Sequence, residues 1–252
     1  MASVRVKESK RPRAGRRFLP IAEKELRSDA LRAVRGLPGA HRDVTVFEEV
    51  AGPFGIPDFL VVIGSKSLLR RRAALPVPPL LNEVDAGIVA VASGRRGFTT
   101  DALAERVGWG AETVDRRLPG LLRSGALKNM GGGRYVRPVA LVPVGRLIAI
   151  ETKVRDFRRA LRQARTYALW CYNYVIVMPS ITAASFGEAV ETVASDRGGI
   201  VVAGRWAQRP GGRRLPPASG LWGSEHVLAA TMRKPSPPLG AGESAKPELE
   251  LA

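Results

Sequence analysis

A glutamate and a lysine stand two positions apart in the apolar segment LIAIETKV, residues 147–154. Alternate residues of a strand share a face, so Glu151 and Lys153 point the same way while Ile148 and Ile150 take the opposite face. Such a pair is common by chance, and a solvated strand face with a weak ion pair would then explain it. If a second carboxylate lies nearby, the same residues can instead carry hydrolytic chemistry.

Other chemistries find little support in the residue types. The single cysteine, Cys171, excludes an internal disulfide and a multi-cysteine zinc site. Two distant histidines, His41 and His226, leave little for a histidine-based metal centre or triad. Cys171 falls on the apolar side of a predicted helix, so we expect it in the core. Any chemistry therefore has to use carboxylates, lysine or hydroxyls.

The net charge of the chain indicates what kind of molecule it binds. The chain of 252 residues carries a formal charge of +17, which predicts a polyanion and most often nucleic acid. An arginine-rich composition with basic tails is the other interpretation, but basic residues also lie along the body of the chain. No segment has the length and apolarity of a membrane span or the pattern of a cleaved leader, so we expect no membrane partner and a cytoplasmic, nucleoid-associated protein.

Strands and helices are predicted on both sides of a central region. Residues 21–35 have helical periodicity, and DVTVFEEV and IPDFLVVI each predict a strand. The basic, proline-rich residues 64–80 are expected to be a linker, and the pattern resumes near Leu141. The later elements are a strand at 144–154, a helix at 155–171, a strand at 172–179, a helix at 185–198 and a strand at 199–205. A polar tail follows, in which SEHVLAATMR can form a short helix.

The central region is predicted to be a compact unit. Thr99 or Thr100 caps a helix that stops at Gly108, and a second helix begins near Ala111. A hairpin with three glycines at its tip follows the second helix. This order of helix, turn, helix and hairpin resembles the winged helix-turn-helix family over about sixty residues.

This resemblance implies that the helix beginning near Ala111 enters the major groove of DNA. Pro119 departs from the pattern, because a proline can kink or shorten that helix. Winged helices also bind proteins, and that alternative stays open. The residues expected to contact DNA are Thr113, Arg116, Arg117, Arg134, Arg95 and Arg96.

With the central unit set aside, the charged pair belongs to a longer pattern of helix, strand, strand, strand, helix and strand. Its motifs are Pro57-Asp58, the triplet from Glu151 to Lys153, and the Q-x-x-x-Y element from Gln163 to Tyr167. The pattern resembles the PD-(D/E)XK nucleases, also called the restriction-endonuclease-like superfamily, over residues 19–70 and 141–205. Family members usually place the two acidic motifs closer together than the roughly ninety residues seen here. An independent module looped out between two adjacent strands accounts for the excess.

The resemblance implies an α/β fold, with a restriction-endonuclease-like αβββαβ core and a mixed central sheet. Asp58 and Glu151 would bind Mg²⁺, for which Mn²⁺ should substitute, with the carbonyl oxygen of Thr152 as a candidate third ligand. Lys153 would orient or deprotonate the attacking water and offset charge in the transition state.

Further residues have roles that the sequence leaves open. Gln163 and Tyr167 either meet the substrate or the catalytic lysine, or only fill the boundary between sheet and helix. Related nucleases often add an acidic residue from the first helix, for which Glu25 is the first choice and Glu23 the reserve. Two more candidates, of which one can face the site because neighbours on a strand alternate, are Glu48 and Glu49.

Together these patterns predict a metal-dependent DNA endonuclease that hydrolyses phosphodiester bonds in duplex or branched DNA. By analogy, double-strand cleavage would favour a homodimer. The alternative is a non-catalytic DNA-binding protein, either a transcription factor or a mobile-element accessory factor, on a nuclease-like scaffold. An RNA-binding or RNA-processing protein ranks last, because few aromatic residues are expected at the surface. The predicted parts are a basic disordered arm (1–18), the nuclease core (19–75 and 141–222), the winged helix insert (76–140) and a mostly disordered tail (223–252).

Overall fold

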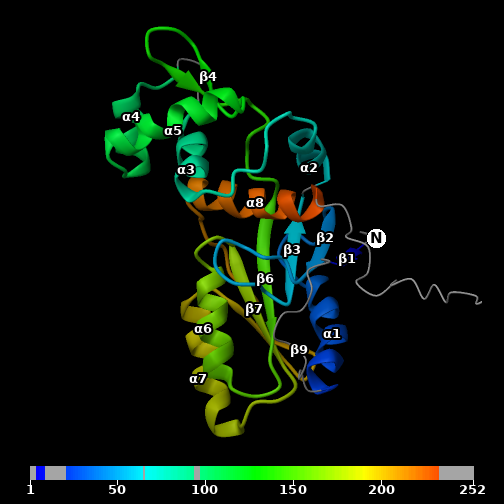
Figure 1. Cartoon of the computed structure of the whole chain (residues 1–252). Helices are drawn as coiled ribbons and strands as arrows, with labels where there is room; N and C mark the ends of the chain where they lie inside the picture. Colours follow the sequence, from blue (N-terminus) through cyan, green and yellow to red (C-terminus); the bar gives the residue numbers. More distant parts are fainter. Residues whose placement is uncertain (1–3, 9–20, 65, 94–96, 233–252) are drawn as a thin grey trace, which may run out of the picture.

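The computed structural model describes residues 4–8, 21–64, 66–93 and 97–232, with side chains from Glu25 onward. The main body contains strands and helices from both ends of this range (Figure 1). Its elements are β1 (Val4–Glu8), α1 (Ile21–Val34), β2 (Val44–Glu48), β3 (Phe59–Ile63), α2 (Lys66–Ala73), β6 (Arg146–Thr152), α6 (Phe157–Tyr167), β7 (Asn173–Met178), α7 (Ala183–Ser195), β8 (Gly199–Val202), β9 (Arg205–Gln208) and α8 (Pro217–Met232).

These strands form one mixed sheet in the order β1-β2-β3-β6-β7-β8-β9. The pairs β2-β3 and β3-β6 are antiparallel, whereas β6-β7 and β7-β8 are parallel. Strand β6 therefore lies at the centre, where an apolar strand buried on both faces belongs. The predicted mixed α/β sheet is confirmed.

Helices cover both faces of the sheet. On one face, Ala30 and Val34 of α1 pack against Ile148 and Ile150 of β6. On the other face, α6 and α7 pack against β7 and β8, and α8 packs against β3 and β6 (Figure 1). Consecutive residues of β6 therefore point to opposite faces of the sheet and contact different helices.

The chain between β3 and β6 contains a smaller unit with its own apolar core. It consists of α3 (Glu83–Val91), α4 (Thr100–Val107), α5 (Ala111–Arg123) and the hairpin of β4 (Lys128–Asn129) and β5 (Tyr135–Val136). Thr99 caps α4 by accepting a hydrogen bond from the Ala102 N–H, and Gly108 ends α4 in the left-handed conformation, both as predicted. Helix α5 begins at the predicted Ala111 and continues through Pro119.

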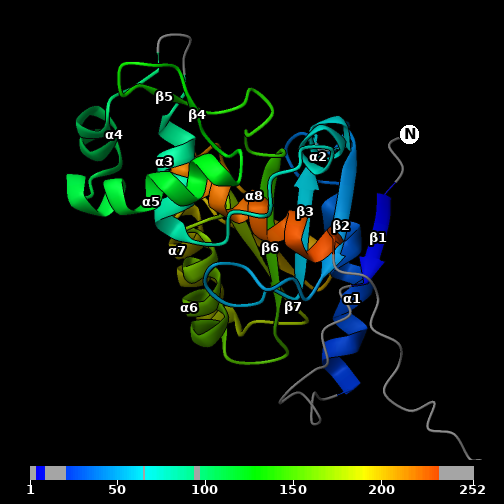
Figure 2. The ribbon, with the colours of Figure 1, turned by 45° about the horizontal axis from the view of Figure 1, so that its top comes forward.

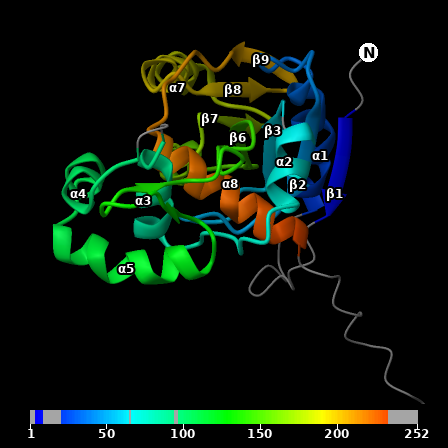
Figure 3. The same ribbon diagram turned by 90° about the horizontal axis from the view of Figure 1, so that it is seen from above.

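Helix α8 belongs to the cores of both units. Its Leu221 packs with the residues of α3, α4 and α5, whereas Val227 packs with the sheet residues Leu60 and Leu147. Figures 2 and 3 show α8 between the smaller unit and the strands of the sheet. The smaller unit is thus packed onto the main body through α8, which differs from the expected looped-out module.

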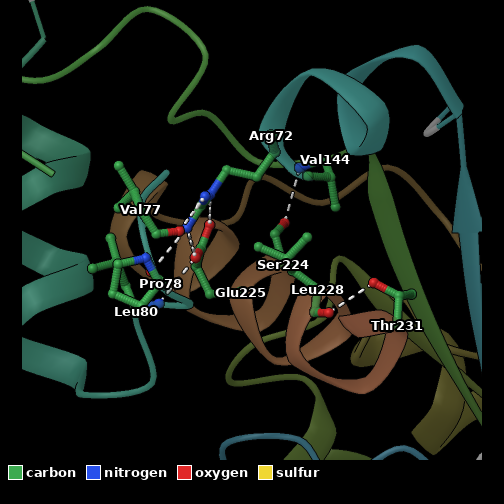
Figure 4. Close-up of polar contacts among 9 residues, drawn as sticks. All are labelled: Arg72, Val77, Pro78, Leu80, Val144, Ser224, Glu225, Leu228 and Thr231. Atoms are coloured by element: carbon green, nitrogen blue, oxygen red, sulfur yellow. Dashed lines mark hydrogen bonds and ion pairs between the residues drawn. The ribbon is translucent and has the colours of Figure 1, made fainter. Parts of the chain in front are cut away.

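A buried ion pair fixes α8 to α2 (Figure 4). The Arg72 guanidinium donates from Nε to Glu225 Oε1 at 2.8 Å and from Nη2 to Glu225 Oε2 at 2.6 Å. Its remaining bonds go to the carbonyl oxygens of Val77 and Pro78, and the Leu80 N–H donates to Glu225 Oε2. These contacts tie the chain that enters the smaller unit to both helices.

Three segments differ from what the sequence predicted. Residues 66–73 of the expected linker form α2, because Arg72 finds its buried partner 153 positions later. The boundary at residue 222 falls inside α8, whose small and apolar residues bury it on several sides. Within the arm at 1–18, Val4–Glu8 form β1, which pairs parallel with β2. The rest of that arm, and residues 233–252 of the tail, lie outside the described residues.

Candidate active site

The charged pair at the end of β6 lies inside the protein. Glu151 is fully buried and the side chain of Lys153 is only 14 % exposed, so the interpretation as a solvated strand face is wrong. Lys153 Nζ lies 2.9 Å from Glu151 Oε1 and also donates to the carbonyl oxygen of Thr152 at 3.2 Å. The lysine backbone continues the ladder, since its N–H donates to the carbonyl oxygen of Val177.

Antiparallel pairing brings Asp58 to the same end of β6. Phe59 pairs with Ile150, so Asp58, one residue earlier, lies beside Glu151. Asp58 Oδ2 accepts two hydrogen bonds, from the backbone N–H and from Oγ1 of Thr152, each at 2.7 Å. The two carboxylates, about ninety residues apart in sequence, are therefore neighbours in the fold.

Helix α6 contributes a hydroxyl group to this cluster. Tyr167 is buried, and its hydroxyl lies 3.0 Å from Glu151 Oε2 and 3.1 Å from the carbonyl oxygen of Ile56. Gln163, one turn earlier, is half buried, and its Oε1 is buried without a hydrogen-bond partner in the described part of the chain. Asp156 positions the helix by accepting the Arg159 N–H at its N-terminus.

The electrostatics of Glu151 are unusual for a carboxyl group. Burial and the negative charge of Asp58 raise its pKa to about 7, against the opposing effects of Lys153 and Tyr167. Glu151 is therefore partly protonated near neutral pH, and a positive charge in addition to that of Lys153 would favour its ionised form. Strongly perturbed carboxyls beside a specific charged partner are common at functional sites.

The donor set is compatible with Mg²⁺. Protein sites for Mg²⁺ often use one or two carboxylates and leave several waters on the ion. Asp58 and Glu151 supply two carboxylates that repel each other, and the carbonyl oxygen of Thr152 lies beside them. Among the residues that the structure describes, no group of three or more histidine, cysteine or acidic side chains is placed to hold a metal.

The candidates for a further acidic residue in the site lie at different distances from the cluster. Glu25 is exposed on α1 and is not brought to the cluster, and the side chain of Glu23 lies outside the described residues. Glu48 forms an ion pair of 2.6 Å with Arg27 of α1. The Glu49 N–H donates to the Asp58 carbonyl oxygen at 3.1 Å, so Glu49 is the candidate that adjoins the site.

Only some of the residues expected to contact DNA are exposed and outside an ion pair. Arg116 is exposed on α5 and donates to Thr113 Oγ1 at 3.4 Å, whereas Arg117 is held by both carboxylate oxygens of Asp85 on α3. Arg134 is exposed on the hairpin. A pocket of about 490 Å³ between α5 and residues 78–82 includes Arg116, Arg117 and Arg123. Two further expected contacts that lie outside the described residues are Arg95 and Arg96.

Residues 51–56, for which the sequence predicted no role, are part of the site. The Ile56 carbonyl oxygen shares the Tyr167 hydroxyl with Glu151. Two glycines of this segment, Gly52 and Gly55, pack against the rings of Trp170 and Tyr167. Glycines at this spacing indicate a turn, but they do not identify these aromatic partners. Cys171 is buried, as predicted.

No family model, curated protein or solved structure matches the chain. Within the described ranges, none of the helices is both long and apolar enough to cross a membrane.

Proposed function

We propose that this protein is a metal-dependent DNA endonuclease of the PD-(D/E)XK type. The observation that carries the proposal is the meeting of Asp58, Glu151 and Lys153 at adjacent ends of β3 and β6. A buried carboxyl with a pKa of about 7, a second carboxylate and an ammonium are costly to bury together, and such an arrangement is more typical of a site than of a core.

The order of the elements supports the proposal. Helix α1, strands β2, β3 and β6, helix α6 and strand β7 follow the αβββαβ order of the restriction-endonuclease-like core, with the smaller unit between β3 and β6. In that unit α3, α4, α5 and the hairpin follow the order of a winged helix. An isolated bridge between Phe98 and Tyr135 joins the residues before α4 to the second strand of the hairpin.

Each residue has a defined part in hydrolysis. Asp58 and Glu151 would hold Mg²⁺, which would polarise the phosphodiester and acidify a bound water. Thr152 fixes Asp58 through two hydrogen bonds, and Tyr167 orients the Glu151 carboxylate. Lys153 lies next to Glu151 Oε1, where its ammonium can orient the attacking water and offset charge on the phosphate in the transition state.

Plasmid cleavage tests this proposal. We expect supercoiled plasmid to be nicked or linearised in Mg²⁺ or Mn²⁺ but not in EDTA. Asp58→Ala and Lys153→Ala should abolish cleavage, whereas Glu25→Ala, at an exposed carboxylate outside the cluster, should retain it. If the wild-type protein binds the plasmid and leaves it as intact as the two site variants do, the enzyme proposal is wrong.

One observation favours a non-catalytic DNA-binding protein as the second candidate. Asp58 Oδ2 is already satisfied by two donors from Thr152, an arrangement that also suits a structural role at the end of a strand. The net charge of +17 and the exposed Arg116 on α5 would then serve binding alone. Binding without cleavage in the plasmid experiment would support this candidate.

A further inference from the structure

Two large apolar side chains are exposed beside the candidate active site. Residues 51–57, which we call the β2–β3 loop, expose Phe54 by 41 % and Ile56 by 40 %. The loop leads directly into Asp58, and Figures 1 and 2 show the chain between β2 and β3 curling out in front of the sheet toward α6. Neighbouring exposed apolar side chains next to a polar site often mark a surface for a ligand.

The β2–β3 loop is held in place by the same helix that supports the site. Trp170 Nε1 donates to the Phe54 carbonyl oxygen at 3.2 Å, and the Tyr167 hydroxyl lies 3.1 Å from the Ile56 carbonyl oxygen. Gly52 packs so closely on Trp170 that a Cβ atom there would lie 2.1 Å from the indole ring. The loop therefore presents its side chains in a preorganised conformation at a fixed position relative to Glu151.

The Phe54 ring is itself positioned by an aromatic neighbour. It meets Trp222 of α8 edge to face, with ring centroids 5.4 Å apart and an interplanar angle of 85°. The Trp222 indole N–H donates to the Leu81 carbonyl oxygen, which fixes the indole. An exposed phenylalanine that is held by a restrained neighbour loses little entropy when a flat ligand stacks on it.

The charge of helix α6, whose C-terminal end holds the loop, indicates the kind of ligand. Helix α6 and the turn before it expose four arginines, none of which forms an ion pair with another described residue: Arg155, Arg158, Arg159 and Arg162. An aromatic side chain beside a basic surface is the combination that binds unpaired nucleobases, with arginines on the backbone and the ring on the base.

We propose that Phe54 and Ile56 form a wedge against which a nucleobase next to the scissile phosphodiester stacks. The inference rests on the proposed function, since it places the base beside the Asp58–Glu151 cluster. Unstacking a base costs least where the base is already unpaired. The wedge therefore makes DNA with unpaired bases, such as a bubble, flap or junction, the preferred substrate over a perfect duplex.

Binding of the full chain to two DNAs in EDTA tests the wedge without relying on cleavage. One is a perfect duplex, and the other contains a three-base bubble with 2-aminopurine at its centre. We expect the wild type to bind the bubble at least roughly ten-fold more tightly and to quench the 2-aminopurine, as stacking on an aromatic ring would. Phe54→Ala and Phe54→Leu should remove both the preference and the quenching, whereas Phe54→Trp should retain them.

The matched control is Phe186→Ala, which removes a phenylalanine of equal exposure (40 %) from α7. It should leave the preference unchanged. The wedge is refuted if Phe54→Ala keeps the wild-type ratio of affinities, or if Phe186→Ala lowers that ratio equally. It is also refuted if Phe54→Ala instead dissociates a dimer, because the apolar pair would then contact a second copy. Plasmid cleavage by the wild type separates these outcomes from failure of the proposed function, which would remove cleavage altogether.

Discussion

Replacing Glu151 by glutamine should change how the stability of the protein depends on pH. Burial and Asp58 raise the pKa of Glu151 from its ordinary 4.5 to about 7. Between these values the folded protein binds more protons than the unfolded chain, so the free energy of unfolding falls as pH rises through this window. The shift corresponds to roughly 3 kcal/mol, since one pKa unit is worth about 1.4 kcal/mol. The wild type therefore has this contribution at low pH and loses it as Glu151 ionises.

Glutamine keeps the shape of the side chain and removes its titration. The difference in unfolding free energy between Glu151→Gln and the wild type should therefore move by roughly 3 kcal/mol in favour of the variant from about pH 4.5 to about pH 7.5. Urea unfolding followed by circular dichroism at a series of pH values measures this difference. Glu25→Gln, at an exposed carboxylate on α1, serves as the reference for removing a negative charge from the surface.

A difference that stays constant within about 0.5 kcal/mol across this pH range would contradict the argument, because Glu151 would then titrate like an exposed carboxyl. Saturating Mn²⁺ should flatten the pH dependence of the wild type, since a bound cation stabilises the ionised carboxylate. EDTA should restore it. If Mn²⁺ has no effect on the wild type, the cluster does not bind a cation.

Three other single substitutions, and one double mutant, test the contacts that build the site and the fold. Arg72→Met should lower the free energy of unfolding by about 3–5 kcal/mol, because it leaves the buried Glu225 carboxylate without its cation, and adding Glu225→Leu should recover at least about 2 kcal/mol in a double-mutant cycle. Thr152→Val should cost about 1–2 kcal/mol in urea unfolding, because one of the two donors to Asp58 Oδ2 is lost, and no change would show that this hydrogen bond is negligible. Pro119→Ala should raise the free energy of unfolding, measured by thermal unfolding, by at least about 1 kcal/mol, because Pro119 lies exposed inside α5 and removes a helix hydrogen bond there; a lower stability would mean that the proline is required.

Elements with a clear period could be predicted from the sequence. The helix at residues 21–35, the strands carrying Asp58 and Glu151, and the cap at Thr99 depend on residues close in sequence, and the structure places them within a few positions of the prediction. The E-x-K spacing also predicted correctly that Glu151 and Lys153 share a face. Local pattern was sufficient where the determining contacts are local.

Long-range contacts explain what could not be predicted. Helix α2 is basic and precedes a proline-rich stretch, and only the pairing of Arg72 with Glu225 gives it a buried position. Which of Glu25, Glu48 and Glu49 adjoins the site depends on which part of the chain pairs with Asp58. No local sequence pattern encodes that pairing. The part played by the Ile56 carbonyl oxygen depended on Tyr167, which comes 111 positions later.

Because α8 completes two cores at once, the smaller unit is not a cassette that can be excised or grafted elsewhere. Removing residues 76–140 would strip the partners from Leu221 and leave one side of α8 bare. A chain shortened before Pro217 would lack α8, and both hydrophobic cores would then be exposed. Any insertion or deletion that shifts α8 by one residue would rotate it by about 100° and disturb both interiors together.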